Sequence, residues 1–375
     1  MLLRTDSRGA TCAQGLVGTG RGGGLVVGSA TVTESAQQTP LWIGTYPAAG
    51  AGTPVGQGEG IWRVDLDPAT GALSAARLVV ETPSPSFLAA RGSVLYAANE
   101  QADGTVSAFD VVGDSLVHRA TVPSGGADPC HLLLDEGGRA LLVANYSSGT
   151  LAVLPLDADG GFAALGPDQV FGHAGSGPDE RQEAPHAHFV ALDPSGAFVL
   201  VSDLGTDEIR RYRRVDGGLA EDGVAAVLPA GTGPRHLVFS ADGRFAYVVG
   251  ELDVTVRVLA WADGVGTLVQ TLPATGAGPR RPGQRVLPSH VALDGDRLLV
   301  AVREAGVLAG FTVRADGLLD PQAEVALPGA WPRHFAVVDG WTVVAEQTSD
   351  DLAVAETAGT SEIPAPACVL RHPVG

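Results

Sequence analysis

Histidine recurs in this sequence shortly after proline, at a spacing that suggests one site assembled from several repeats. Five segments carry the pattern, and their histidines are His131, His186 or His188, His236, His290 and His334. Histidine titrates near neutral pH and therefore suits general acid–base catalysis. A repeated histidine can equally stabilise the contact between neighbouring repeats, and the sequence leaves both roles open. The segment with two histidines departs from the pattern and is the better candidate for chemistry.

Arginine and glutamate stand at comparable places. Arg235 and Arg333 each follow a proline of the repeat, and Arg303 ends an apolar segment. An arginine at the end of a buried segment needs an anion or a carboxylate beside it. Glu251, which follows Gly250, could pair with these arginines or act as an acid–base group. The set suits a site that binds a phosphate or carboxylate and polarises a carbonyl.

Six apolar segments end in polar side chains, which we expect to converge on a central channel: Asn99, Asn145, Asp203, Glu251, Arg303 and Glu346. Four of them, Asn99, Asn145, Asp203 and Glu251, carry oxygens that could bind calcium, which leaves a metal-assisted reaction open. Our main hypothesis uses no metal and no cofactor. We interpret Cys130, beside His131, as a packing residue rather than a nucleophile.

The repeat also predicts the fold. Its prolines are Pro85, Pro129, Pro185, Pro234, Pro288 and Pro332, spaced by 44, 56, 49, 54 and 44 residues. Periods near 40 to 50 residues are typical of propeller blades, and each unit reads as four short strands with tight turns. A further unit lies upstream at 41–80, and 365–370 supplies a closing strand. We therefore predict an all-β protein, a seven-bladed β-propeller of four-stranded antiparallel blades.

The predicted ring is one domain, residues 41–375. Residues 1–40 are expected to be a disordered leader or an upstream mis-start of the reading frame, with export as a further alternative. Two inserts rich in glycine and proline, 172–183 and 276–285, are expected to form loops at one rim of the ring.

Composition narrows the possible partners. The net charge of −18 disfavours nucleic acid and anionic membrane surfaces. Three cysteines without a paired spacing do not form a disulfide framework, which favours a cytoplasmic location. No apolar run is long enough to span a membrane. We expect a monomer or weak homodimer.

Six motifs in order carry a resemblance to a known family: Leu41-Trp42-Ile43-Gly44-Thr45-Tyr46, Pro185-His186-Ala187-His188, Gly233-Pro234-Arg235-His236, Gly250-Glu251-Leu252, Ala345-Glu346-Gln347-Thr348-Ser349-Asp350 and Pro366-Ala367-Cys368-Val369. The chain resembles the lactonase family of seven-bladed propellers, which includes propeller-type 6-phosphogluconolactonases and carboxy-muconate lactonising enzymes. The resemblance implies a catalytic set of His186 or His188, Arg235, Glu251 and Arg303. We expect substrate contacts from His131, Asn145, His236, Arg333 and Gln347.

The main hypothesis is hydrolysis of an anionic sugar lactone, 6-phosphogluconolactone to 6-phosphogluconate. Histidine would activate water as a general base, and arginine would stabilise the oxyanion and hold the anionic group. The alternatives are a lactone-forming cycloisomerase, a metal-assisted lactonase, and a binding scaffold without catalysis.

Overall fold

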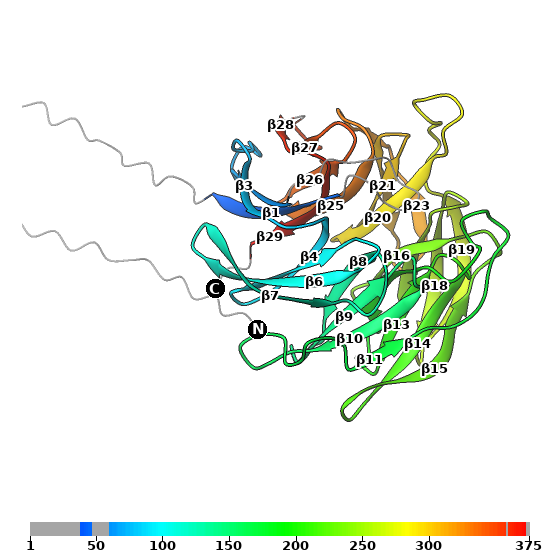
Figure 1. Ribbon diagram of the computed structural model, residues 1–375. Coiled ribbons are helices and arrows are strands. Elements are labelled where there is room, and N and C mark those ends of the chain that lie inside the picture. The colour runs from blue at the N-terminus through cyan, green and yellow to red at the C-terminus, as the bar shows by residue number, and fades with distance from the viewer. Residues whose placement is uncertain (1–37, 47–59, 358, 373–375) are drawn as a thin grey trace, which may run out of the picture. The chain divides into compact units, whose positions relative to one another are not determined.

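The computed structural model describes residues 38–46, 60–357 and 359–372. All regular elements in these ranges are strands, and none of the described residues forms a helix that could cross a bilayer. Figure 1 shows the strands gathered in small twisted sheets. The prediction of an all-β protein is therefore confirmed. The leader expected at 1–40 lies outside the described residues up to residue 37, and the first strand begins at Thr39.

The strands form seven antiparallel sheets, which we number as blades 1 to 7. Blade 1 contains β29 (Pro366–Arg371), β1 (Thr39–Thr45), β2 (Gly60–Leu66) and β3 (Arg77–Glu81). Blade 2 contains β4 (Pro85–Arg91), β5 (Val94–Asn99), β6 (Thr105–Val112) and β7 (Ser115–Pro123). Blade 3 contains β8 (Pro129–Leu134), β9 (Ala140–Asn145), β10 (Thr150–Pro155) and β11 (Gln169–Phe171). Blade 4 contains β12 (Ala187–Leu192), β13 (Phe198–Asp203), β14 (Glu208–Val215) and β15 (Gly218–Val227).

The remaining blades follow the same order. Blade 5 contains β16 (Pro234–Phe239), β17 (Phe245–Gly250), β18 (Thr255–Ala262) and β19 (Val265–Pro273). Blade 6 contains β20 (Leu287–Asp294), β21 (Arg297–Arg303) and β22 (Val307–Val313), and both β23 (Leu319–Pro321) and β24 (Val325–Ala326) pair with β22. Blade 7 contains β25 (Pro332–Val338), β26 (Trp341–Glu346), β27 (Asp351–Val354) and β28 (Gly359–Glu362).

The first strands of the blades contact one another in a closed circuit, from β29 through β4, β8, β12, β16, β20 and β25 back to β29. The circuit closes because β29, near the carboxyl end, pairs with β1, with Val369 opposite Ile43. This pairing removes the exposed edges that an open ring would leave. The seven-bladed propeller and the closing strand predicted from the sequence are both confirmed.

Apolar side chains from adjacent blades pack between the sheets and form the core. In one such layer Tyr96 and Val106 of blade 2 lie against Leu141 and Val143 of blade 3. The Tyr96 hydroxyl also donates a hydrogen bond of 2.6 Å to the carbonyl of Gly160, in a turn of blade 3. Successive side chains of a strand point to opposite faces of the sheet, so each blade can pack one face against the preceding blade and the other against the following blade.

Every blade has a β-bulge where its first strand pairs with its second. The pairs in blade 2 run from Pro85–Asn99 directly to Phe87–Ala98, which leaves Ser86 as an extra residue. The extra residues in blades 1 to 7 are, in order, Ala367, Ser86, Cys130, His188, Arg235, Ser289 and Arg333. A bulge re-aims the side chain of its extra residue out of the regular alternation.

One residue follows the bulge in each of the seven blades. Six of these seven residues are aromatic and form a closed ring of neighbours: Phe87, His131, Phe189, His236, His290 and His334. Neighbouring ring centroids are between 4.0 and 5.8 Å apart. The repeated histidines therefore fill the channel and join neighbouring blades, which is one of the two roles that the sequence left open.

Candidate active site

The polar residues that end the second strands do not all converge, contrary to our expectation. Asn145 donates hydrogen bonds to the Ser124 carbonyl and the Thr150 hydroxyl of its own blade. Asp203 accepts the backbone N–H of His186 and of the turn after β13. Asn99 donates to the Thr105 and Ser107 hydroxyls of its own blade, and Glu346 accepts the backbone N–H of Gly329, in the connection between blades 6 and 7. These four residues pair with the first residue of the neighbouring strand, and their side chains lie on the face away from the pocket.

Successive side chains of a strand point to opposite faces of the sheet, so the residue after each of these strand ends points toward the pocket side. The equivalent residues in blades 1 to 7 are Tyr46, Glu100, Tyr146, Leu204, Glu251, Arg303 and Gln347. Glu251 and Arg303 belong to this second set, because Gly250 and Val302 are the residues that pair with the prolines. In four of the six blades, the residue predicted to face the channel therefore lies one position before the residue that does so.

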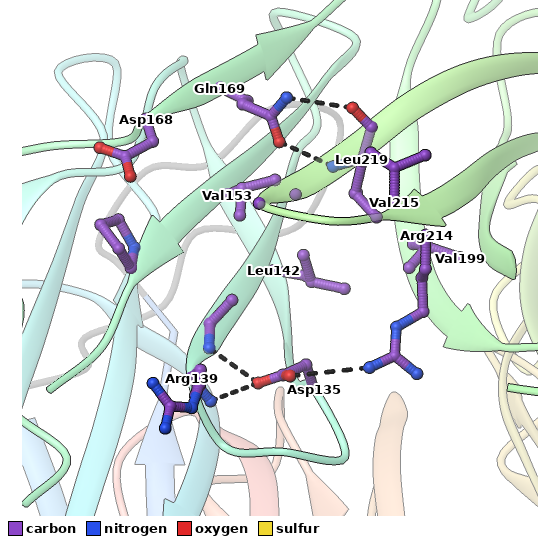
Figure 2. A pocket seen from close by; sticks show the side chains of 14 residues that line it. Asp135, Arg139, Leu142, Val153, Asp168, Gln169, Val199, Arg214, Val215 and Leu219 are labelled. Atoms are coloured by element: carbon purple, nitrogen blue, oxygen red, sulfur yellow. Dashed lines mark hydrogen bonds and ion pairs between the residues drawn. The ribbon is translucent and has the colours of Figure 1, made fainter. Parts of the chain in front are cut away.

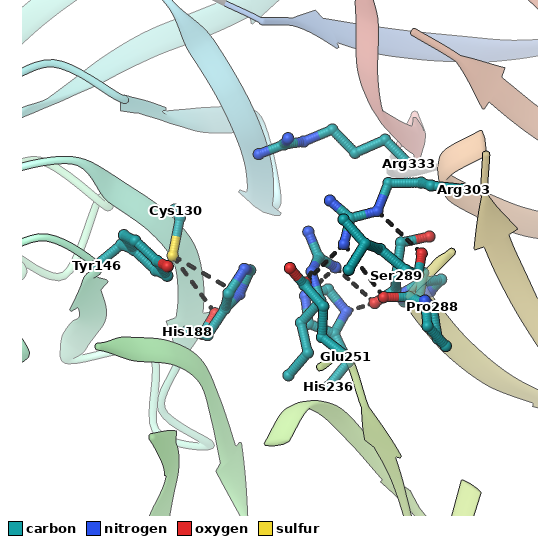
Figure 3. Close-up of polar contacts among 12 residues, drawn as sticks. Cys130, Tyr146, His188, His236, Glu251, Pro288, Ser289, Arg303 and Arg333 are labelled. Atoms are coloured by element: carbon teal, nitrogen blue, oxygen red, sulfur yellow. Dashed lines mark hydrogen bonds and ion pairs between the residues drawn. The ribbon is translucent and has the colours of Figure 1, made fainter. Parts of the chain in front are cut away.

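These positions and the bulges build one narrow pocket with a cavity volume of about 10 Å³, about the space of one water molecule. Its lining residues are Tyr46, Glu100, Cys130, Tyr146, Arg181, His188, Arg235, Glu251, Arg303 and Arg333. Four come from bulges, five from the ends of second strands, and Arg181 from the loop before β12. Figure 3 shows His188 beside Cys130 on one side, and the Glu251 carboxylate near Arg303 on the other. The structure thus brings together four of the five predicted catalytic residues, namely His188, Arg235, Glu251 and Arg303.

Glu251 is the centre of the charge network. Its Oε2 lies 2.8 Å from Nε of Arg235 and 2.6 Å from Nη2 of Arg303. Its Oε1 accepts a hydrogen bond of 2.5 Å from Nη1 of Arg181. Burial opposes ionisation, but the charges of Arg303, Arg181 and Arg235 together hold the pKa of Glu251 well below its usual range. The carboxylate is therefore ionised, and each of its oxygens lies within 2.8 Å of a guanidinium nitrogen.

The arginines around Glu251 are held by further contacts. Arg235 donates to the Ser289 carbonyl at 2.5 Å, and Arg303 donates to the carbonyls of Leu287 and Pro288. Burial and the charge of Arg303 lower the pKa of Arg235 to about 9, which leaves it protonated at neutral pH. Two fixed positive groups with well-defined directions are suited to stabilise a developing oxyanion.

Arg181 was not predicted from the sequence. It lies on the first of the two inserts and donates a hydrogen bond of 3.0 Å to the Tyr146 hydroxyl as well as contacting Glu251. Asp179 of the same insert forms an ion pair of 2.8 Å with Arg285 of the second insert, so both inserts lie at one rim as predicted. Because Arg181 stands outside the repeat, no periodic signal in the sequence could have identified it.

A second cluster lies across the pocket. The Arg333 guanidinium stacks over the Tyr46 ring at 4.0 Å, and its Nη2 is 3.5 Å from Oε2 of Glu100. The Tyr46 hydroxyl donates a hydrogen bond of 2.9 Å to Oε1 of Glu100. Nη1 of Arg333 is buried and has no hydrogen-bond partner among the described residues. This buried donor can serve a ligand.

The structure separates the two histidines that the sequence could not. His188 is the bulged residue of blade 4 and lines the pocket, whereas His186 stacks on Tyr146 and contacts the Tyr146 carbonyl and Glu183. Blade 4 begins its pairing at Ala187 and not at Pro185, so the equivalent of the other channel histidines is Phe189. Burial and the nearby charge of Arg235 hold the pKa of His188 well below its usual range.

The other predicted contacts lie outside the pocket lining. His131 and His236 belong to the aromatic ring in the channel, and Asn145 is bonded within blade 3. Gln347 is buried, and its side-chain amide has no hydrogen-bond partner among the described residues. Of the predicted substrate contacts, Arg333 alone is in the lining. Burial raises the pKa of the Cys130 thiol far above its usual range, which is consistent with a packing role.

The calcium alternative requires Asn99, Asn145, Asp203 and Glu251 to share one ion. The first three are bonded within their own blades, and Glu251 is surrounded by arginines. Within the described part of the chain, no group of three or more His, Cys, Asp and Glu side chains could hold a metal ion. These residues do not fit a calcium site.

The sequence model of a family described as "Lactonase, 7-bladed beta-propeller" matches residues 40–363. The chain belongs to this family. It is 31% identical to the 6-phosphogluconolactonase of Bacillus subtilis over 355 residues, which are 88% of this chain and 97% of that protein. The protein is therefore a lactonase-family enzyme.

Solved structures of relatives have the same fold. The periplasmic gluconolactonase PpgL of Pseudomonas aeruginosa superposes with a TM-score of 0.79 at 30% identity, covering 90% of this chain and all of that one. A protein from Lactobacillus plantarum gives a TM-score of 0.78 at 28% identity, with 90% and 100% coverage. The lactonase-type propeller is thus complete in this chain, from blade 1 to blade 7.

A larger groove lies elsewhere on this lactonase-family propeller, between blades 3 and 4, and has a volume of about 390 Å³ (Figure 2). The Gln169 side chain exchanges two hydrogen bonds with the Leu219 backbone at its edge. Its lining is mainly apolar, with Asp135 and Arg214 as a distant pair. None of the predicted site residues is in this groove, so size alone does not identify the active site.

Proposed function

We propose that the protein hydrolyses a phosphorylated sugar lactone, 6-phosphogluconolactone, to 6-phosphogluconate in the pocket at the channel mouth. One observation carries the proposal: in a chain of net charge −18, the pocket sets four arginines, Arg181, Arg235, Arg303 and Arg333, against two carboxylates, Glu100 and Glu251. Buried arginines in excess of carboxylates favour an anionic ligand. The relatives named 6-phosphogluconolactonase and gluconolactonase support a lactone, and the excess charge supports its phosphate.

The two clusters suit two parts of such a substrate. Arg333, with a free donor and a single long ion pair, is proposed to bind the phosphate. Arg235 and Arg303 are held by Glu251 and are proposed to stabilise the oxyanion that forms when water attacks the lactone carbonyl. Because their directions are fixed before the reaction, they pay little reorganisation cost; a single such donor is worth about 10²- to 10³-fold in rate.

His188 is proposed to position the attacking water. Its imidazole is neutral, so it can hold a water molecule by a hydrogen bond, but its low pKa makes it a weak proton acceptor. We further propose a cytoplasmic location, since Cys130 and Cys368 are free thiols.

The test is an assay of the purified protein on 6-phosphogluconolactone and on unphosphorylated gluconolactone, each corrected for spontaneous opening. We expect a higher kcat/KM for the phosphorylated lactone, unaffected by a chelator. Arg333→Gln should raise KM for the phosphorylated lactone more than for the neutral one, because only the first has the anionic contact to lose.

Arg210→Gln is the matched control, since Arg210 pairs with Glu208 outside the pocket. It should leave both KM values unchanged. Equal effects of Arg333→Gln on the KM of both substrates would contradict the phosphate assignment, and no turnover above the spontaneous rate would refute the proposed function. Loss of activity with the chelator would favour the metal-assisted alternative.

A further inference from the structure

Hydrolysis requires a group that accepts the proton of the attacking water, and most of the pocket residues are unsuited to it. Glu251 is ionised, but three arginines occupy its two oxygens. His188 is buried beside Arg235 and binds a proton weakly. The Cys130 thiol is buried and un-ionised. The acceptor must therefore lie elsewhere in the lining.

Glu100 has the geometry that these residues lack. It follows β5 in blade 2, at the position that Glu251 occupies in blade 5, and is 6% exposed. One oxygen, Oε1, accepts the hydrogen bond from Tyr46 and is thereby oriented. The other, Oε2, makes no hydrogen bond of good geometry within the described residues and has Arg333 at 3.5 Å. A carboxylate with one oxygen anchored and the other open can contact a water molecule in the pocket.

We infer that Glu100 is the general base of the lactone hydrolysis, an inference that rests on the proposed function. Glu100 takes a proton from water while the water oxygen bonds to the lactone carbonyl carbon, and the carbonyl electron pair moves to its oxygen. Collapse of this intermediate breaks the ring C–O bond. The protonated Glu100 then returns the proton to the leaving ring oxygen, and the new carboxylic acid loses its own proton to solvent.

The surroundings of Glu100 adjust its pKa in the useful direction. Burial raises the pKa of Glu100 above its usual range, while the charge of Arg333 and the nearby hydroxyls of Ser86 and Tyr46 oppose the rise. Asp128 raises it slightly further, and the neighbouring Cys130 thiol is un-ionised. A base is most effective when its pKa approaches the working pH. The lactonase rate should therefore rise with pH as Glu100 ionises.

The first test is Glu100→Gln, which keeps the shape and the acceptor for Tyr46. We expect kcat to fall by about 10²- to 10⁴-fold, with little change in KM, and the rise of kcat with pH to disappear. Glu100→Asp should restore part of kcat together with the pH dependence. Glu304→Gln is the control, because Glu304 follows Arg303 in sequence but pairs with Arg281 outside the pocket. It should keep the wild-type kcat and pH profile.

A second variant, Tyr46→Phe, tests the assignment without removing the carboxylate. It keeps the ring under Arg333 but deletes the hydrogen bond that favours ionised Glu100. The rise of kcat with pH should therefore move to higher pH, by about one unit, the effect of one hydrogen bond to a charged group. A structural role for the Glu100 cluster would lower the melting temperature without moving this pH dependence.

The outcomes separate the two proposals. If the wild-type protein hydrolyses the lactone but Glu100→Gln keeps its kcat and pH profile, Glu100 is not the base and the proposed function stands. An unmoved pH dependence in Tyr46→Phe overturns the inference in the same way. If no lactone is turned over by the wild-type protein, both proposals are refuted.

Discussion

Replacing Glu251 with glutamine should reveal how much of the stability of the ring depends on the charge network of the pocket. The substitution preserves the size of the side chain but removes the one negative charge shared by Arg181, Arg235 and Arg303. Removing one partner of a buried ion pair costs about 3–5 kcal/mol, because the remaining charge is left uncompensated. The entropy of unfolding is about 2.1 cal/mol/K per residue, so a unit of about 340 residues has about 0.7 kcal/mol/K. Glu251→Gln should therefore lower Tm by about 4–7 °C.

The assay is thermal unfolding of the wild-type protein and the variant, with and without inorganic phosphate. Because the variant has three uncompensated guanidinium groups, phosphate should bind it more tightly and raise its Tm more than that of the wild type. A ligand at 100 times its Kd contributes about 2.7 kcal/mol, or about 4 °C for a unit of this size. The kcat/KM for the lactone should fall as well, because Arg235 and Arg303 lose the group that orients them.

Glu208→Gln is the matched control, since Glu208 pairs with Arg210 on the outer part of blade 4 and contributes about 1 kcal/mol or less. A Glu251→Gln variant with unchanged Tm and full turnover would refute the reasoning. It would mean that the three ion pairs neither stabilise the ring nor position the arginines for catalysis.

Two further predictions concern the channel and the rim. Burial holds the pKa of the channel histidines below 6.5, and that of His334 at about 3. Below about pH 6.5 the unfolded chain therefore binds protons that the native state does not. The free energy of unfolding should fall there by about 1.4 kcal/mol per pH unit for each histidine. His334→Phe, which copies the residue of blades 2 and 4, should make this slope shallower by about one proton in urea unfolding at pH 5 to 7, and an equal slope would contradict the assignment. Asp179→Asn weakens the exposed ion pair with Arg285 and should raise KM by at most about fivefold, with kcat and Tm unchanged, because such a pair contributes about 1 kcal/mol or less. A clear fall in Tm would show instead that the two inserts stabilise the ring.

The fold could be predicted because its signal is spread over the whole chain. Each blade repeats a proline, two apolar strands and a turn, and the seven units close into one ring. The prediction is less accurate in blade 4, because the sequence aligns Pro185 with Pro129, whereas strand pairing begins at Ala187. The proline favours the start of a first strand but does not define it, so a shift of two residues left the period almost unchanged.

The candidate site depends on strand register to within one residue, and the sequence does not show that register. Asn99 and Glu100 are both polar, and both end an apolar strand, yet the first bonds within its blade and the second lines the pocket. Only the pairing of Asn99 with Pro85 shows which is which. The bulge that places His188 in the pocket is likewise a feature of the backbone register. Arg181 could not be found at all, because it belongs to no repeat.

The seven bulges explain how long arginines fit into a crowded ring. Arg235, on the bulge of blade 5, reaches across blade 6, where the bulged residue is the small Ser289, and bonds to its carbonyl. Arg333, on the bulge of blade 7, reaches across blade 1, where the bulged residue is Ala367, and stacks on Tyr46. Each arginine therefore occupies the space of two bulge positions. It fits only because the bulged residue of the next blade is small. A large side chain at Ser289, which is fully buried, would displace Arg235 from Glu251. The positions of the pocket arginines are thus determined by pairs of neighbouring blades, whereas the ring of aromatic side chains is formed by one residue from each of six blades.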